Sequence, residues 1–294
     1  MRNIKVLLHG MPYHTKVFEE QLREFSNGIF EPVYCENLSD NFEFTHFDLF
    51  HLISTPLPTL KKFVKYNKPV FYHWIGTDVY RILNDFYIKR WMKKRLIAQS
   101  GIFNLVVSES LKIELAQIGI SSEILPLVNL DFVKECPPFP EKYSVLTYIP
   151  RDRWDFYHGD LIMGLARELP DVDFHILAVG DISQKPDNVF TYGFIDDVTP
   201  FYKNSCVLIR LTTHDGLPKM ILEALSYGRQ VLWSEKFPYS YFVKNQDDCM
   251  EALISLKSNI SINQAGKEFV ETHYHPQKIC SDYLTLCRKL IESK

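Results

Sequence analysis

The sequence has no long apolar run and no cysteine motif, and these absences exclude several classes of protein. No stretch approaches the roughly 18 apolar residues that a membrane-spanning helix needs. The first ten residues hold too short an apolar core for a signal peptide. The six cysteines include no Cys-x-x-Cys pair, so their spacing supports neither a zinc site nor a disulfide framework. We therefore expect a protein of the reducing cytoplasm.

Strong charge of one sign is also missing. The net charge is −3, and neither half of the chain is strongly basic, so nothing indicates a nucleic-acid partner. The 294 residues are enough for about two domains. Apolar residues make up 46% of the chain and charged residues 23%, which is usual for a globular protein with a packed core.

Short apolar strands alternate with helical segments along both halves of the chain. The first half predicts strands at 4–8, 48–53, 69–73, 105–107 and 123–125, and helices at 15–25, 57–66, 87–98 and 110–118. The second half predicts strands at 144–149, 174–179, 189–192, 207–211 and 231–233, and helices at 159–169, 199–203, 219–227, 249–256, 263–272 and 277–291. Such alternation predicts parallel sheets covered by helices. The stiff stretch Pro137-Pro138-Phe139-Pro140 suggests two domains, 1–138 and 139–294.

The segment from Asp215 to Gly228 carries the strongest functional signal. Asp215 lies in a turn with glycine and proline, and Glu223 lies in the apolar helix that follows. Backbone N–H groups at the start of that helix suit a phosphate, and carboxylates suit the hydroxyl groups of a sugar and a ribose. The alternative interpretation is an ordinary turn–helix–strand unit with a proline in its first helical turn.

This segment resembles the acid-x7-acid signature of retaining glycosyltransferases with the GT-B fold, in particular those of family 4. Asp215 replaces the usual first Glu, whereas the other signature positions match: Gly216, Pro218, Glu223, Ala224 and Gly228. The resemblance implies two Rossmann-like domains with parallel sheets that face each other across a cleft. The first domain would bind the acceptor and the second the nucleotide sugar. The last helix, about 277–291, would cross back onto the first domain after a break at Pro276.

The resemblance also assigns roles to residues that follow strands of the second domain. Arg153 and Asp215 would be catalytic, the first by neutralising the donor diphosphate and the second by holding the donor sugar. Glu223 would bind the ribose. His158 stands where the family has Lys, and a neutral imidazole is a weaker counter-charge. The other donor-binding candidates of this domain are Arg151, Phe194, Ile195, Arg210, His214, Gly216 and Leu217.

These assignments have plainer alternatives. The loop arginines would equally be solvated surface charges, and Phe194 would equally be a packed core residue. In the first domain, the resemblance makes His73 a catalytic residue near the anomeric carbon of the donor sugar. It also places Gly10, at the end of the first strand, near the diphosphate. A structural histidine, followed by a Gly76-Thr77-Asp78 turn that caps the next helix, is the alternative.

Tyr87 to Ile97 packs five cations among aromatic and aliphatic residues. Several transferases of this fold use such a patch to sit on an anionic membrane, through shallow apolar insertion and charge attraction. A solvated helix face with extended lysines explains the pattern slightly better. Peripheral contact with the inner face of a membrane is therefore a secondary expectation.

We expect no metal and no cofactor. Asp171-Val172-Asp173 matches the Asp-x-Asp metal motif formally, but its place between a helix end and a strand favours a turn. His273-Tyr274-His275 lacks further ligands at zinc spacing.

The sequence as a whole suggests a retaining, hexosyltransferase-like glycosyltransferase of polysaccharide biosynthesis. It would move a sugar from a nucleotide-diphosphate donor, with UDP-sugar favoured, to a glycan or a lipid-linked acceptor. One alternative is a non-catalytic sugar-nucleotide-binding partner in a glycan-assembly complex, which the missing Lys would allow. Another is a sugar-nucleotide epimerase on the same fold. The pattern does not indicate which sugar or acceptor is used.

Overall fold

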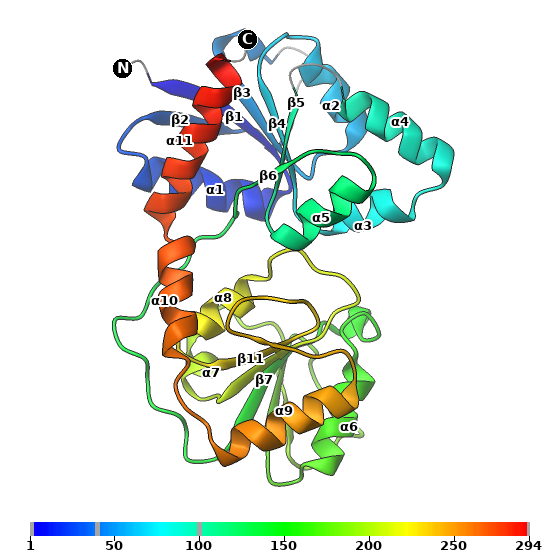
Figure 1. Ribbon diagram of the computed structural model, residues 1–294, viewed down its shortest axis with the longest axis vertical. Coiled ribbons are helices and arrows are strands. Elements are labelled where there is room, and N and C mark those ends of the chain that lie inside the picture. Colours follow the sequence, from blue (N-terminus) through cyan, green and yellow to red (C-terminus); the bar gives the residue numbers. More distant parts are fainter. Residues whose placement is uncertain (1–2, 39–41, 99–101, 293–294) are drawn as a thin grey trace. The chain divides into compact units, whose positions relative to one another are not determined.

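The computed structural model describes residues 3–38, 42–98 and 102–292, and it divides into two compact α/β units (Figure 1). Unit 1 comprises Met1–Asn129 and Tyr274–Lys294, and unit 2 comprises Leu130–His273. Each unit is built on a six-stranded sheet in which all pairings are parallel. The expected fold class of two parallel α/β sheets is confirmed, whereas the assignment of acceptor and nucleotide binding to separate domains stays a prediction.

Unit 1 has the strand order β2-β1-β3-β4-β5-β6. Its strands are β1 (Ile4–Gly10), β2 (Phe30–Tyr34), β3 (Leu49–Ile53), β4 (Val70–Trp74), β5 (Ile102–Val106) and β6 (Glu123–Ile124). Its helices are α1 (Pro12–Phe25), α2 (Leu57–Val64), α3 (Thr77–Asn84), α4 (Tyr87–Ile97), α5 (Glu109–Gln117) and α11 (Pro276–Glu292), with a 3-10 turn at Phe44–His46. The central strands β3 and β4 are buried along their whole length, as expected where helices cover both faces of a parallel sheet.

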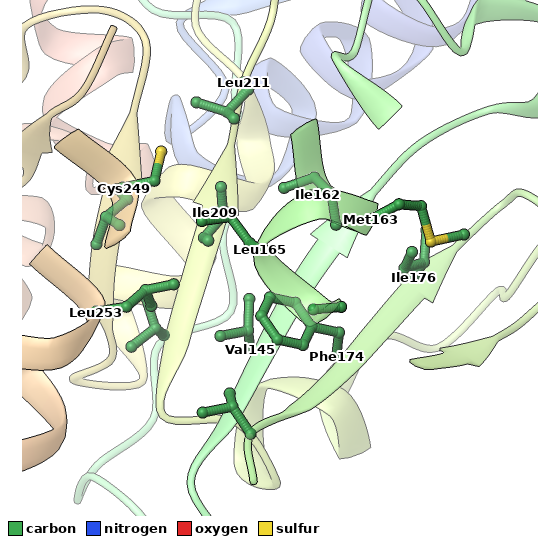
Figure 2. Close-up of a cluster of buried hydrophobic side chains, with 14 of the residues drawn as sticks. Val145, Ile162, Met163, Leu165, Phe174, Ile176, Ile209, Leu211, Cys249 and Leu253 are labelled. Atoms are coloured by element: carbon green, nitrogen blue, oxygen red, sulfur yellow. The ribbon is translucent and has the colours of Figure 1, made fainter. Parts of the chain in front are cut away.

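Unit 2 has the strand order β12-β11-β10-β7-β8-β9. Its strands are β7 (Ser144–Tyr148), β8 (Asp173–Leu177), β9 (Val189–Thr191), β10 (Val207–Arg210), β11 (Gln230–Trp233) and β12 (Tyr241–Phe242). Its helices are α6 (Gly159–Glu168), α7 (Thr199–Lys203), α8 (Lys219–Ser226), α9 (Gln246–Ser258) and α10 (Gln264–His273), with a 3-10 turn at Arg151–Arg153. Figure 2 shows its core, where Val145 and Ile209 of the sheet pack with Leu165 of α6 and Leu253 of α9. Burial of each such side chain stabilises the fold by about 1.5–3 kcal/mol.

The last helix belongs to unit 1, as the resemblance predicts. Helix α10 ends at His273 in unit 2, and α11 begins at Pro276, which suits a first helical position because proline lacks an N–H donor. Helix α11 lies beside α1 in Figure 1. The ring of Tyr283 lies 5.1 Å from that of Phe18, so α11 closes the core of unit 1.

Gly10, which ends β1, is held to glycine by its surroundings. Its φ angle is +135°, a region that other residues rarely adopt. A Cβ atom at this position would lie 1.9 Å from the carbonyl oxygen of Ile53 on the neighbouring strand β3. The close approach of two strand ends therefore explains this glycine without any ligand.

The sequence pattern does not predict β2, β12 or α3. Strand β2 contains Pro32, which disrupts the strand pattern but is tolerated because β2 lies at the edge of its sheet. Strand β12 has two residues, too few for any periodicity. Helix α3 follows Gly76, where the Asp78 carboxylate accepts hydrogen bonds from the N–H groups of Ile75 and Gly76 at 3.1 and 3.0 Å. The Asp78 carboxylate therefore holds the turn that leads into α3.

Candidate functional site

The candidate donor residues of unit 2 follow strands of one parallel sheet. The loops after β7, β10 and β11 all leave the carboxyl ends of neighbouring strands, so they emerge at the same edge. This is the edge at which open α/β sheets bind their ligands. The structure therefore brings the Arg151–His158 loop and the Asp215 turn to one side of unit 2.

Arg210 and Asp215 form a buried ion pair at this edge. Arg210 ends β10 and is only 8% exposed. Its Nε and Nη2 donate to Asp215 Oδ2 at 3.0 and 2.7 Å. Burial by itself would lower the pKa of Arg210, but Asp215 and Tyr157 outweigh it and raise the pKa. The guanidinium, stacked 4.8 Å above the Tyr157 ring, therefore stays charged and fixes the carboxylate.

A second carboxylate, which the sequence pattern does not single out, also holds this turn. Glu235 follows β11, and its Oε1 accepts a hydrogen bond from the N–H of Asp215 at 2.9 Å. The other oxygen of Asp215, Oδ1, accepts from the N–H of Gly216 at 3.0 Å. Glu235 follows the carboxyl end of a strand beside β10, and that position is the only sequence signal that points to it.

Glu223 lies on α8 with both carboxylate oxygens engaged. Its Oε2 accepts from the hydroxyl of Tyr202 at 2.7 Å, and its Oε1 pairs with Lys219 Nζ at 2.9 Å. Burial, followed by the Glu223 charge, raises the pKa of Tyr202 well above its usual value, so the phenol stays protonated and donates. Tyr202 comes from α7, and no sequence signal linked that helix to Glu223.

The loop after β7 presents its arginines to solvent. Arg151 donates to the carbonyl of Asp181 at 2.6 Å, and the Arg153 guanidinium stacks 4.1 Å above the ring of Phe156. His158 is exposed with a left-handed φ of 51°, and it immediately precedes helix α6. A cavity of about 450 Å³ follows this loop, lined by Arg151, Asp152, Arg153, Trp154, Asp155 and Phe156.

The remaining candidates of unit 2 vary in exposure. The side chain of Phe194 is 79% exposed, which excludes the core interpretation and leaves its ring accessible to a ligand. Ile195, His214 and Leu217 are partly buried, and Gly216 is buried in the turn. The roles of these residues in donor binding stay predictions.

Unit 1 places His73 in its interior. The side chain is completely buried, and its Nδ1 lies 3.0 Å from Nε2 of His51. Burial lowers the pKa of His73 to about 3, so the ring is neutral. The ring is thus shielded from direct contact with a ligand in this structure, and its catalytic role stays a prediction.

Two features bear on the metal and membrane expectations. Within residues 3–38, 42–98 and 102–292, no group of three or more His, Cys, Asp or Glu side chains is arranged to hold a metal ion. Asp171 and Asp173 instead pair with Lys257 and Lys142, in keeping with the turn interpretation. Across the same described ranges, none of the helices combines the length and apolar character needed to span a bilayer.

Comparisons with known proteins identify the fold. No family model matches the chain. A lipopolysaccharide 1,6-galactosyltransferase of Salmonella typhimurium is 27% identical over 146 residues, which cover 43% of this chain and 41% of that protein. The chain thus spans well under half the length of this curated relative.

Two solved structures resemble the whole chain. A sucrose-phosphate synthase from Thermosynechococcus elongatus gives a TM-score of 0.72 at 11% identity, covering 100% of both chains. HepE of Anabaena, in complex with UDP and glucose, gives a TM-score of 0.69 at 11% identity, covering 97% of this chain and 100% of that one. The α/β chain with two six-stranded parallel sheets therefore has the GT-B fold.

Proposed function

We propose that this protein is a retaining glycosyltransferase similar to those of family 4. It would transfer a hexose from a nucleotide-diphosphate sugar, with UDP-sugar favoured, to a glycan or a lipid-linked acceptor. The observation that carries the proposal is the pair of fixed carboxylates, Asp215 and Glu223, set around the start of α8 at the carboxyl edge of unit 2.

Glu223 is the residue that we assign to the ribose. A carboxylate can accept two hydroxyl hydrogens, one from each hydroxyl group of a diol. Tyr202 orients Glu223 from one side, and Lys219 is 40% exposed, so it can leave its ion pair when a nucleotide enters. Phe194 would stack on the base, since its ring is exposed.

Charge on the departing diphosphate would be stabilised at the same edge. The start of α8 offers N–H groups and the positive end of a helix dipole. Arg153 adds a solvent-facing cation, whereas Arg210 is committed to Asp215. Positively charged groups aimed at developing negative charge lower the barrier to departure. An oxygen of the departing phosphate would then take the proton from the hydroxyl group of the acceptor, on the same face of the sugar. No step in this scheme requires a metal.

Thermal unfolding with UDP, GDP and CMP, and then with their sugar conjugates, tests the donor. A ligand that binds only the folded state raises the apparent stability, by about 2.7 kcal/mol at 100 times its Kd. We expect UDP to raise the unfolding temperature most. Turnover of a UDP-sugar only in the presence of an acceptor supports transfer. Turnover without acceptor supports the epimerase, and binding without any turnover supports the non-catalytic partner.

Replacing Glu223 tests the nucleotide site directly. We expect Glu223→Ala to weaken UDP binding by about tenfold or more, because hydrogen bonds to a charged group contribute about 1.5–3 kcal/mol each. Glu251→Ala is the matched control, since it removes an exposed glutamate from another helix of unit 2, α9. Equal UDP affinity in the two variants would remove the basis for this site.

We also propose that α4 rests on an anionic membrane. Ile88 and Met92 are 70% and 53% exposed, and they share one face of the helix with Trp91. The basic residues Lys89, Arg90, Lys93, Lys94 and Arg95 surround this apolar stripe. An apolar face turned toward water does not fit a plain solvated helix, and it fits shallow insertion between anionic headgroups.

Sedimentation with vesicles, with or without phosphatidylglycerol, measures this contact. We expect binding that needs the anionic lipid and falls as salt rises. Ile88→Ser with Met92→Ser should release the protein. Lys61→Gln with Lys62→Gln, on the exposed basic part of α2, should leave binding nearly unchanged. Equal loss in the two double variants would show that net charge alone is at work.

A further inference from the structure

A cavity of about 580 Å³ lies within unit 1, and its volume is typical of a small-molecule site. It is lined by the end of α4, by the first residues of β5 and by the loop 119–122 that leads into β6. The cavity therefore lies at the amino-terminal ends of these two strands. Open α/β sheets usually bind their ligands at the opposite edge, so this cavity is separate from the sites considered above.

Two cations that line the cavity have no acidic partner within the described ranges. Lys94 is half-buried against the turn that ends α5, where a Cβ atom added to Gly119 would lie 3.3 Å from Lys94 Nζ. Arg95 is exposed, and its guanidinium lies 5.5 Å from the centre of the Trp91 ring. Both charges are therefore available to an anion in the cavity.

Neutral hydrogen-bond donors line the same cavity. The Oδ1 atom of Asn104 accepts a hydrogen bond from the indole N–H of Trp74 at 3.1 Å. Because an indole nitrogen can only donate, this contact fixes the orientation of the amide and leaves Nδ2 with two N–H groups to offer. Ser122 is only 8% exposed, and its hydroxyl is buried with no hydrogen-bond partner among the described residues. Burial of such a group is costly, which indicates that a polar occupant fills the cavity.

Negative charge around the cavity is weaker than the positive charge. Glu123 also lines it, but this side chain is exposed and its carboxylate lies 3.9 Å from Lys112 Nζ. Helices α4 and α5 both end beside the cavity, and each such end carries about half a negative charge. The two full charges of Lys94 and Arg95 exceed the sum of these helix ends, so the cavity favours an anion.

The cavity adjoins the apolar stripe of α4. Trp91 lines the cavity, and it shares one face of the helix with Ile88 and Met92, the exposed residues that we propose to enter a membrane. Arg95 follows Trp91 by one helical turn on that face. Phe103 adds a second aromatic ring to the lining. An anion that carries an apolar chain would thus meet cations and apolar side chains together.

We propose that this cavity binds the phosphate group of a single anionic phospholipid. Lys94 and Arg95 pair with the phosphate, Asn104 Nδ2 and the Ser122 hydroxyl donate hydrogen bonds to it, and Trp91 packs against the start of the acyl chains. The lipid as the source of the phosphate rests on the proposed contact of α4 with a membrane, whereas the anion-binding chemistry of the cavity does not. Such a site saturates at one lipid per chain, unlike general attraction between charges.

Calorimetric titration of the full chain with dihexanoyl phosphatidylglycerol, kept below the concentration at which it forms micelles, tests the cavity. We expect saturable binding of one lipid per chain. Dihexanoyl phosphatidylcholine has the same chains but adds a cation, and glycerol phosphate lacks the chains, so each should bind about tenfold more weakly or less. Equal affinity for glycerol phosphate would overturn the lipid as the occupant. No binding of phosphatidylglycerol would show that water alone fills the cavity and would overturn the whole proposal.

Two variants test the residues of the cavity. Lys94→Gln should weaken the binding of phosphatidylglycerol about tenfold, because a charge-assisted hydrogen bond is lost. Lys89→Gln is the matched control, since it makes the same change in charge at an exposed position of α4. Equal affinity in these two variants would overturn the proposal. Ser122→Ala should weaken binding about threefold or more, while the unfolding temperature of the free protein holds or rises. Full affinity in Ser122→Ala would overturn the contact of Ser122 with the phosphate.

The double variant Ile88→Ser with Met92→Ser separates the cavity from the proposed membrane contact. Neither residue is among the described residues that line the cavity. The variant should therefore fail to sediment with vesicles and yet bind the monomeric lipid with unchanged affinity. Loss of both would show that the lipid binds the apolar stripe instead and would overturn the cavity as its site. Binding of the monomeric lipid by a wild-type protein that does not sediment with vesicles would overturn the membrane contact alone.

Discussion

The two units hold their buried and half-buried polar groups in opposite ways. Unit 2 uses charges that are paired and partly exposed, such as Arg210 with Asp215 and Lys219 with Glu223. Unit 1 uses neutral rings, and His51 and His73 are completely buried in its core. Burial of a charge is costly unless it is paired, whereas a neutral ring needs only its hydrogen bonds. Paired charges therefore suit the partly exposed edge of unit 2, whereas neutral rings suit the interior of unit 1.

Removal of Arg210 should have the largest effect. Arg210→Met leaves the Asp215 carboxylate, 18% exposed, without its cation. Loss of one partner of a buried pair costs about 3–5 kcal/mol, and we expect about 2–4 kcal/mol here because Asp215 keeps some contact with water. Urea denaturation measures the free energy of unfolding.

The matched control is Arg151→Met, which removes an exposed arginine from the same edge of unit 2. We expect a cost below about 1 kcal/mol for this change. Similar losses in the two variants would contradict the view that the edge of unit 2 is built around one buried ion pair.

Acidification should destabilise unit 1, because its buried histidines are neutral in the folded state and would have to take up protons. The pKa of His73 is about 3 in the folded protein and 6.5 in the reference state, so between these values the unfolded chain binds more protons. Stability therefore rises with pH across that range and falls on acidification below about pH 6.5. Between pH 6.5 and 4.5, His73 alone should account for a loss of about 2–3 kcal/mol.

The measurement compares the wild-type protein with His73→Gln over this pH range by urea denaturation. The variant should lose about 2–3 kcal/mol less than the wild type on acidification, whatever its stability at pH 7. His46→Gln, at an exposed position, should follow the wild-type curve. Parallel curves for wild type and His73→Gln would show that His73 takes up its proton without cost to the fold.

The same contrast explains how much the sequence could predict. The parallel α/β sheets follow from alternating strands and helices, whereas the GT-B fold came from the resemblance of one segment to a known signature. The acid pair around α8 follows from a turn, a proline and two carboxylates at fixed spacing. These are local patterns, which periodicity and turn chemistry encode. The sequence pattern does not predict strand β2, because Pro32 interrupts the strand pattern of this edge strand.

Contacts between distant segments were beyond such patterns. Tyr202 and Glu223 are 21 residues apart, and His51 and Tyr283 are 232 residues apart. Nothing in the local sequence of α7 or α11 marks a hydrogen-bond donor for another element. The prediction that His73 contacts a ligand likewise required knowledge of which face of β4 the side chain occupies. The helix that covers this face, α11, lies at the other end of the chain.

Removal of the Tyr202 hydroxyl should show how much a charged acceptor adds to the stability that a hydrogen bond contributes. Tyr202→Phe deletes a buried donor to the Glu223 carboxylate, and we expect a cost of about 1–2 kcal/mol. Tyr192→Phe is the comparison, because that hydroxyl lies 3.1 Å from the imidazole of His175, for which burial lowers the pKa. A neutral bond should contribute about 0.5–1 kcal/mol. Equal costs in urea denaturation would mean that the charge of Glu223 adds nothing.

The smallest effect on stability should come from Lys219. It pairs with Glu223 one helical turn away and is 40% exposed. Such pairs contribute about 0.3–0.5 kcal/mol, and a lysine in the first turn of α8 opposes the helix dipole. Lys219→Gln should therefore leave the free energy of unfolding within about 0.5 kcal/mol of the wild type.

The effect of Lys219→Gln on nucleotide binding is more informative than its effect on stability. If Glu223 binds the ribose, Lys219→Gln removes a competitor for its Oε1 atom, and UDP affinity, measured by calorimetry, should hold or rise. If Lys219 instead contacts the diphosphate, affinity should fall about tenfold, with a loss that grows as salt is lowered. The two outcomes separate a lysine that competes for the Glu223 carboxylate from one that binds the donor, although neither changes the fold. Unit 2 would then be a site whose charges exchange partners when the ligand arrives, in contrast to the fixed rings of unit 1.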